Sequence, residues 1–403
     1  NTSFRGVFKG LQVTPLVLVA SILVPYGAFQ LIASVHGTTF SWPAYDLPYR
    51  IVLFSSGFLG GLLIALVSNK YLEFHQVMLG ACFAWLALAI ALYLYTPVAA
   101  NLIILPLIVI SLIYAISSFF SEQITRYALL LSLVFVVPVT LGLVLPLEAS
   151  QGYRLIIVTM PFIALFMTIF VPLIHGAELK LPLIATTITL AIALVVAISS
   201  PLYSEHRPQH VNIIYFEQLG TDEGYYWLQH RNPLPEQLQT AHEWSSEKKA
   251  LVPYSAFEYS NWYQTEASGF EEVQYTIKSD QSHDTGRTLE LGLTSPRNAR
   301  TIQLVLPATT KLASFRLDGN EFKPQQITDN LDERYYFLRF DGVYEREVPL
   351  TLELGSSEPI EAFLIDRSTE LPRSASKLLE QRSKVLSPQH TGDRAILIKT
   401  ITL

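Results

Sequence analysis

The chain has 403 residues, a net charge of −6 and 15% charged residues, well below the roughly 25% of an ordinary soluble protein. A single cysteine, Cys82, excludes a disulfide framework and a cysteine-ligated zinc site within this chain. Residues 1–200 carry 7 Lys and Arg against 5 Asp and Glu, a net of +2, whereas residues 201–403 carry 21 against 29, a net of −8. The acidic second half argues against nucleic acid as a partner, because nucleic acid favours a clustered basic surface.

Seven apolar runs fill the first half of the chain, each near the roughly 17–25 residues that a membrane-spanning helix needs. They cover residues 13–35, 49–67, 77–95, 99–120, 127–145, 155–174 and 181–198. Since lipid offers no hydrogen-bond partner to the backbone, runs of this length should be helices. Residues 1–203 are therefore predicted to form a multispanning α-helical membrane bundle of about seven helices, with the lipid bilayer as its partner.

Basic residues in the connections predict the orientation of this bundle. One side has five basic residues, which are Arg5, Lys9, Lys70, Arg126 and Lys180. The other side has three, which are Arg50, Arg154 and Arg207. The positive-inside rule places the first side, and with it Asn1, in the cytoplasm. An odd number of spans then puts residues 204–403 outside, in a periplasm or a lumen. The predicted location is a bacterial inner membrane or an organelle membrane.

Two features of the membrane half could carry function. Gly57 and Gly61 form a pair of small residues four apart, which allows helices to approach closely; packing within the bundle is the favoured reading and a dimer contact the alternative. Transporters usually place ionisable residues at membrane depth. His36, His75 and His175 fall at the ends of their runs, so they are read as interfacial residues rather than as parts of a transport site.

The second half, residues 204–403, is predicted to be a mostly-β, sandwich-like soluble domain. Short β-rich runs recur with turn signals between them, at 211–216, 273–278, 288–293, 301–306, 313–317, 335–340, 348–354, 360–365 and 394–403. Asp318-Gly319 lies between Phe315 and Leu317 on one side and Phe322 on the other, and predicts a hairpin turn. Helical spacing predicts a helix over residues 375–386.

A search of the same half for catalytic chemistry predicts none. Glu271 and Glu272 are adjacent carboxylates, but with no His-x-Asp or His-Glu-x-x-His motif they are read as a solvated strand edge. His206 and His210 are four apart, but a proline between them prevents a helical ligand face. The segment 366–368 is read as a charged, structural turn after a strand. No catalytic, cofactor-binding or metal-ligating residue is therefore predicted in this chain.

The order of features resembles the C-terminal half of the membrane-anchored zinc exopeptidases, the group of the endoplasmic-reticulum metallopeptidase and the vacuolar membrane protease. The segments that carry the resemblance are RPQHVNIIYFEQ, YYWL, SPRNARTIQLVLP, FRLDG, FLIDRSTELP and GDRAILIKTITL, all within residues 207–403. The helices resemble the group only in number and layout.

The resemblance implies that a zinc-binding peptidase domain precedes the helices in the same polypeptide and is the partner of this chain. Zinc and its ligands would lie in that upstream domain, so no ligand position transfers to this chain. The expected function is that of the membrane-anchoring and accessory half of a zinc exopeptidase, from a fragment or a processed product. The alternative from another class is a non-enzymatic transporter or receptor with an external binding domain.

The predicted orientation can be tested with single cysteines. In a Cys82→Ser background, cysteines placed at Asn69 and at Ser279 should react with a membrane-impermeant maleimide from opposite sides of sealed vesicles, because an odd number of spans separates them. Labelling of both positions from the same side would contradict the odd number.

Overall fold

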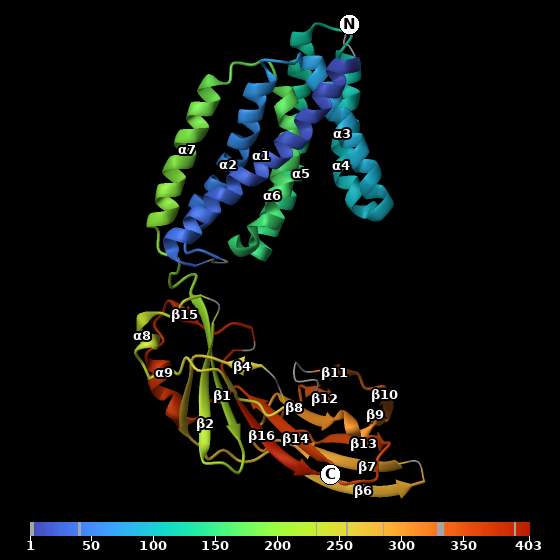
Figure 1. Cartoon of the computed structure of the whole chain (residues 1–403), viewed down its shortest axis with the longest axis vertical. Helices are drawn as coiled ribbons and strands as arrows, with labels where there is room; N and C mark the ends of the chain where they lie inside the picture. Colours follow the sequence, from blue (N-terminus) through green and yellow to red (C-terminus); the bar gives the residue numbers. More distant parts are fainter. Residues whose placement is uncertain are drawn as a thin grey trace. The chain divides into compact units, whose positions relative to one another are not determined.

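The computed structural model describes residues 4–38, 42–230, 232–254, 257–284, 286–328, 334–390 and 392–403. The chain divides into two compact units, Asn1–Tyr203 and Ser204–Leu403. The first is helical and the second is rich in β-strands (Figure 1). Each unit has its own buried core, and each is described separately.

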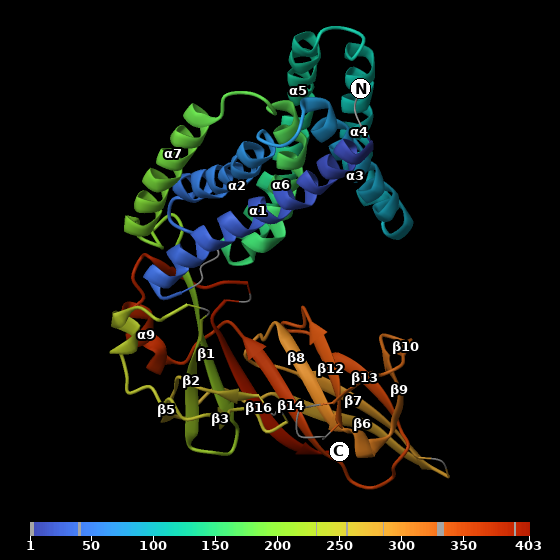
Figure 2. The ribbon, with the colours of Figure 1, turned by 45° about the horizontal axis from the view of Figure 1, so that its top comes forward.

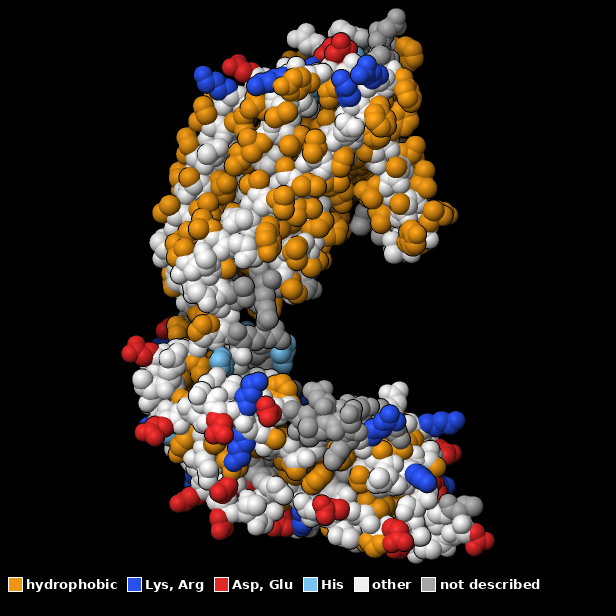
Figure 3. Space-filling model, viewed as in Figure 1, with side chains coloured by type: hydrophobic (Ala, Val, Ile, Leu, Met, Phe, Trp, Pro, Cys, Tyr) orange, Lys and Arg blue, Asp and Glu red, His pale blue; other side chains and the backbone are white. Residues whose placement is uncertain are grey.

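Seven α-helices make up the described part of the helical unit, with a short 3-10 helix η1 (Tyr153–Leu155) before the sixth. They are α1 (Phe4–His36), α2 (Asp46–Ser68), α3 (Phe74–Tyr95), α4 (Pro97–Ser117), α5 (Glu122–Gln151), α6 (Ile156–Leu173) and α7 (Lys180–Ser199). Six of them are long and apolar enough to cross a membrane, and α4 adds the shorter apolar stretch Ile103–Ser117. Hydrophobic side chains cover the visible face of this unit, and Lys and Arg gather at the end that carries the N-terminus (Figure 3). These features mark an integral membrane protein.

The small residues of α2 pack inside the bundle. A side chain at Gly57 would meet Ile163 of α6 at 2.7 Å, and one at Gly61 would meet Met167 of the same helix at 2.4 Å. Between them, a side chain added at Gly60 would meet the backbone oxygen of Ala20 on α1 at 2.5 Å. The pair predicted to allow close approach therefore brings α2 against helices of the same chain.

A second close approach joins α1 and α3. A side chain at Gly80 would meet the backbone of Gly10 at 2.3 Å, so the two helices cross with their backbones almost in contact. Helices α3 and α4 are joined by a very short connection. Helix α3 ends at Tyr95, and α4 begins at Pro97, a position where the missing N–H of proline costs no helical hydrogen bond.

The β-rich unit contains sixteen strands among its described residues. They are β1 (Gln209–Gln218), β2 (Glu223–His230), β3 (Lys249–Ala250), β4 (Glu258–Tyr259), β5 (Trp262–Glu266), β6 (Gln274–His283), β7 (Gly286–Thr294), β8 (Thr301–Pro307), β9 (Leu312–Leu317), β10 (Asn320–Phe322), β11 (Gln326–Thr328), β12 (Arg334–Asp341), β13 (Val348–Leu354), β14 (Glu361–Ser368), β15 (Leu386–Ser387) and β16 (Arg394–Thr402). The short helices are α8 (Glu236–Gln239), α9 (Ser376–Glu380), η2 (Ala308–Thr310) and η3 (Arg373–Ala375).

These strands form a nine-stranded sheet, a five-stranded sheet and a two-stranded sheet. The large sheet has the order β11-β12-β8-β14-β16-β1-β2-β5, with β15 paired to β1 off this path (Figures 1 and 2). The five-stranded sheet has the order β10-β9-β13-β7-β6. One buried cluster contains Leu304 and Leu364 of the large sheet together with Leu291 and Leu352 of the five-stranded sheet. The inward faces of the two sheets therefore share one apolar core.

Most strands lie where the alternation of apolar residues predicts them. Those expected at 301–306 and 348–354 are confirmed as β8 and β13. The Asp318-Gly319 turn is also confirmed: it joins β9 to β10, and both residues have positive φ, 48° and 80°. This conformation suits Asp and Gly and matches the twist of a hairpin.

Two local predictions are wrong. Only Ser376–Glu380 of the expected 375–386 helix is α-helical, because the chain then turns into β15, where Leu386 pairs with Gln209 of β1. Tertiary pairing overrides the helical spacing here. The segment 366–368 is not a turn but the end of β14, and Asp366 within it is fully buried.

The β-rich unit should fold alone, because its cores are built from its own strands and about 200 residues suffice for an independent core. Residues 204–403 expressed without the helices should be soluble and should unfold cooperatively in urea. Leu304→Asp should abolish that transition, since it buries an unpaired charge in the shared core. The same substitution at Ile277, which is exposed on β6, is the matched control; equal effects at both positions would contradict the assigned core.

Candidate functional site

A polar cleft of about 1050 Å³ lies in the β-rich unit. One wall is β5 with the segment that follows it, and the other is the segment between β14 and α9. The lining residues are Asp222, Tyr263, Gln264, Thr265, Glu266, Ala267, Ser268, Gly269, Phe270, Glu370, Leu371, Pro372, Arg373 and Ser374. Three carboxylates and one guanidinium among them make the lining net acidic.

A buried carboxylate holds one wall of the cleft in place. Glu217 is on β1, and its Oε2 accepts hydrogen bonds from the Tyr215 hydroxyl at 2.7 Å and from the Ser268 N–H and hydroxyl at 2.8 and 2.5 Å. Three donors compensate the buried charge. Burial, and then the hydrogen bond and charge of Glu217, raise the pKa of Tyr215, so its hydroxyl stays a donor. Gly224 leaves room for this hydroxyl, because a side chain there would lie 2.1 Å from it.

A buried ion pair lies beneath the same wall. Asp366 on β14 accepts from Nη2 of Arg297 at 2.5 Å and from the Ser295 hydroxyl at 2.6 Å. The guanidinium of Arg297 also lies over the ring of Phe270, 4.6 Å from its centre, and Phe270 lines the cleft. Ions buried this deeply persist only when paired and hydrogen-bonded, so this pair fixes the loop before β8 against β14.

One tyrosine contacts both walls of the cleft, one through an aromatic contact and the other through a hydroxyl pair. Tyr226 on β2 stacks on Tyr263 of β5 at 6.3 Å between ring centres. Its hydroxyl lies 2.7 Å from the hydroxyl of Ser374, which lines the cleft. Glu217, Tyr226, Arg297 and Asp366 come from four separate segments of the chain, and all four support this cleft.

The polar groups of the cleft are hydrogen-bond donors and acceptors. The hydroxyl of Ser268 donates to Glu217 and that of Ser374 is bonded to Tyr226. No histidine lies among the lining residues, so neither serine has the imidazole base of a catalytic triad there. The exposed carboxylates and Arg373 can instead hydrogen-bond a polar ligand.

The histidines and carboxylates that the sequence suggested as possible ligands do not come together at one site. His210 is on β1, where its Nδ1 lies 3.4 Å from the Ser387 hydroxyl, and burial followed by the charge of His390 lowers its pKa. Glu271 and Glu272 lie in the irregular segment before β6 rather than on a strand edge, and Glu272 pairs with Lys399 at 2.7 Å. Within the described ranges, no three His, Cys, Asp or Glu side chains come close enough to hold a metal ion.

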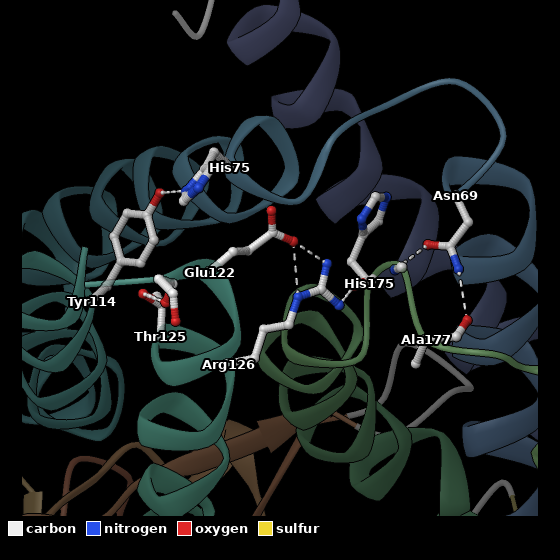
Figure 4. Close-up of polar contacts among 10 residues, drawn as sticks. Asn69, His75, Tyr114, Glu122, Thr125, Arg126, His175 and Ala177 are labelled. Carbon is white, nitrogen blue, oxygen red and sulfur yellow. Dashed lines mark hydrogen bonds and ion pairs between the residues drawn. The ribbon is translucent and has the colours of Figure 1, made fainter. Parts of the chain in front are cut away.

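A polar cluster at one end of the helical unit holds the connection between α6 and α7 (Figure 4). Arg126 of α5 pairs with Glu122 and donates to the carbonyl oxygen of His175. Asn69 accepts from the N–H of Gly176 at 3.0 Å and donates to the carbonyl oxygen of Ala177 at 3.4 Å. The connection is thus fixed to α5 and to the α2–α3 turn.

The three membrane-half histidines differ in their surroundings. His75 shares a 2.8 Å hydrogen bond with the Tyr114 hydroxyl (Figure 4), and His36 is the last residue of α1. His175 is buried, and neither of its ring nitrogens has a hydrogen-bond partner among the described residues. Burial lowers the pKa of His175, so the ring is neutral at pH 7 and packs as part of the connection.

One charged group that the sequence search passed over lies near the other end of the helices. Glu148 of α5 is buried and accepts from Nε of Arg50 on α2 at 2.6 Å and from the Tyr153 hydroxyl at 3.0 Å. The signal available in the sequence was a lone glutamate close to the end of a long apolar run. Because the charge is paired, this network ties α2 to α5 rather than forming an open ion site.

Comparison with known proteins gives no relative for this chain: no family model matches the sequence, and no curated protein matches it.

Removing the buried carboxylate should destabilise the β-rich unit strongly. Asp366→Ala leaves the Arg297 charge buried without a counter-ion, which costs about 3–5 kcal/mol. Glu347→Ala is the matched control, since it breaks a half-exposed pair with Lys278 and should cost under about 1 kcal/mol. Urea denaturation of residues 204–403 measures both; similar losses would contradict a supporting role for the buried pair.

Proposed function

We propose that this chain is the membrane-anchoring and external accessory half of a zinc-dependent exopeptidase. Its helices, seven spans in this proposal, anchor the polypeptide. Its β-rich unit is a two-sheet sandwich in the periplasm or lumen. A peptidase domain upstream in the same polypeptide would carry the zinc and the catalytic residues.

One observation carries the proposal: the segments that resemble the exopeptidase group are neighbours in space. Five of them contribute β8, β14, β16, β1 and β2, which are consecutive strands of the large sheet. The sixth, FRLDG, forms the end of β9 and the turn after it. The resembling segments thus make up the centre of the large sheet. Their adjacency supports a shared domain rather than isolated matches.

The second support is that four of those segments contribute residues to the walls of the polar cleft. Residues from four of them, Glu217, Tyr226, Arg297 and Asp366, hold the walls of the polar cleft. A polar cleft without a nucleophile and base suits a unit that guides or positions a peptide chain while chemistry occurs in another domain. The accessory role is therefore substrate access, with hydrolysis left to the upstream domain.

The test compares this chain with a version extended upstream in its own coding sequence. Purified in detergent, the chain alone should bind no stoichiometric zinc and release no amino acid from aminoacyl reporter substrates. The extended polypeptide should do both, and a chelator should abolish its activity. Zinc content is measured by atomic emission and hydrolysis by fluorescence.

Two outcomes would reject the proposal in different ways. Stoichiometric zinc in the chain alone, lost on His210→Ala, would reveal a metal site of its own. An extended polypeptide that neither binds zinc nor cleaves the reporters would favour the transporter or receptor alternative.

A further inference from the structure

One edge of the large sheet is open where it borders the polar cleft. Strand β5 is the last strand of the sheet and pairs with β2 on one side (Figure 2). On its other side, the one bridge among the described residues is at its first residue, where the carbonyl oxygen of Trp262 accepts from the N–H of Ser245 at 2.8 Å. Residues 263–266, the rest of the strand, line the cleft. We call their side away from β2 the open edge of β5.

Two hydrogen bonds fix which backbone groups face the open edge. The N–H of Ala267 donates toward β2, to the carbonyl oxygen of Asp222 at 3.1 Å, whereas the carbonyl group of Trp262 points away from β2. Successive residues of an antiparallel strand direct their N–H and C=O groups to opposite sides. Gln264 and Glu266 are in phase with Trp262 and out of phase with Ala267. Their backbone groups therefore point to the open edge.

These outward groups are available to a further strand. Among the described residues, no backbone or side-chain group is hydrogen-bonded to the main-chain N–H or C=O of Gln264, or to the N–H of Glu266. The carbonyl oxygen of Glu266 accepts a long, 3.4 Å hydrogen bond from the Tyr215 hydroxyl. Unpaired groups along an edge strand are a template for pairing with another chain. An extended peptide can supply that strand.

The charge of the cleft indicates which side chains such a peptide carries. Three exposed carboxylates line the cleft, those of Asp222, Glu266 and Glu370, against the guanidinium of Arg373. None of the three carboxylates forms an ion pair with another residue that the structure describes. The lining therefore complements a cationic ligand, because its negative charges have no counter-ion from the described chain.

We propose that the cleft binds an extended basic peptide, which adds as a strand to the open edge of β5. Main-chain hydrogen bonds to Gln264 and Glu266 hold any peptide sequence, and the carboxylates select Lys and Arg side chains. The cleft volume of about 1050 Å³ is at the upper limit of the roughly 300–1,000 Å³ of small-molecule pockets, as suits a chain segment. This inference rests on the access role proposed for the cleft and names its substrate class.

The first test is fluorescence anisotropy with the full chain in detergent at constant ionic strength. The probe is a fluorescein-labelled octapeptide of alternating threonine and lysine. It should bind saturably, and roughly tenfold more tightly than the same peptide with glutamate in place of lysine, because like charges oppose binding. Wild type without saturable binding, or with equal affinity for the two peptides, would overturn the proposal.

Two methylated peptides test strand addition on the wild-type chain, so the result does not depend on the folding of variants. In an added strand, the N–H groups of alternate peptide residues face β5 and the others face away. The octapeptide N-methylated at its lysines and the one N-methylated at its threonines have the same number of methyl groups. One should lose roughly tenfold or more in affinity and the other should retain it; equal affinities would overturn strand addition.

Charge variants test the carboxylates. Glu266→Gln and Glu370→Gln should each weaken binding of the lysine peptide about threefold, as expected for an exposed ion pair. Glu345→Gln is the matched control, since it removes an equal charge from an exposed turn of the same unit and should leave the affinity unchanged. Equal affinities in wild type and in both cleft variants would overturn the role of the carboxylates.

The outcome is separable from that of the zinc experiment. An extended polypeptide that cleaves the reporters, together with a chain that binds no lysine peptide, would overturn this inference alone. Binding of the lysine peptide with the expected methylation pattern, together with an extended polypeptide that has no zinc, would support the peptide site and reject the exopeptidase assignment.

Discussion

The parallel pairing of β1 with β16 is the contact on which the β-rich unit depends. It joins the first long strand after the helices to the last strand of the chain, with Ile214 opposite Arg394 and Gln218 opposite Ile398. Strand β2 and then β5 add to one side of this pair, and β14, β8 and β12 add to the other. The sheet can therefore be completed only when the final strand is in place. Many contacts in this unit join residues that are far apart in the sequence, and forming them costs loop-closure entropy.

That pairing also sets which side chains face the cleft. Glu217 of β1 projects toward the cleft while Arg394 of β16 projects from the other face of the sheet, because alternate residues of paired strands face opposite ways. Residues 366 and 367 divide in the same manner: Asp366 supports the cleft and Arg367 lies on the other face. A one-residue slip in register would exchange these side chains between the faces and remove the support of the cleft.

The sequence was sufficient to predict the kind and order of the secondary-structure elements. It was insufficient to predict which residues pair with the buried charges. Long uncharged runs require helices in lipid, and alternating apolar residues require half-buried strands, so these could be read locally. The turn at Asp318-Gly319 is also a local matter, since it needs only two residues that tolerate positive φ. Asp366, however, can be buried because it pairs with Arg297, 69 residues away. Glu148 can be buried because it pairs with Arg50, 98 residues away. No local pattern distinguishes such residues from solvated charges, which is why segment 366–368 was misread as a turn.

The positions of the charged residues in the helices help to decide whether the bundle forms a transport conduit or serves as a membrane anchor. Within the described part of the helical unit, Asp, Glu, Lys, Arg and His side chains lie in the first two turns or the last turn of the helices or in the connections between them. Glu148, which is buried, is paired across helices with Arg50. Meanwhile backbone-close contacts, as between Gly10 and Gly80, lock α1 against α3. A conduit needs polar groups at mid-depth and helices free to move past one another. Charges near the helix ends and helices that interlock through glycine therefore favour the anchoring role proposed above over a conduit.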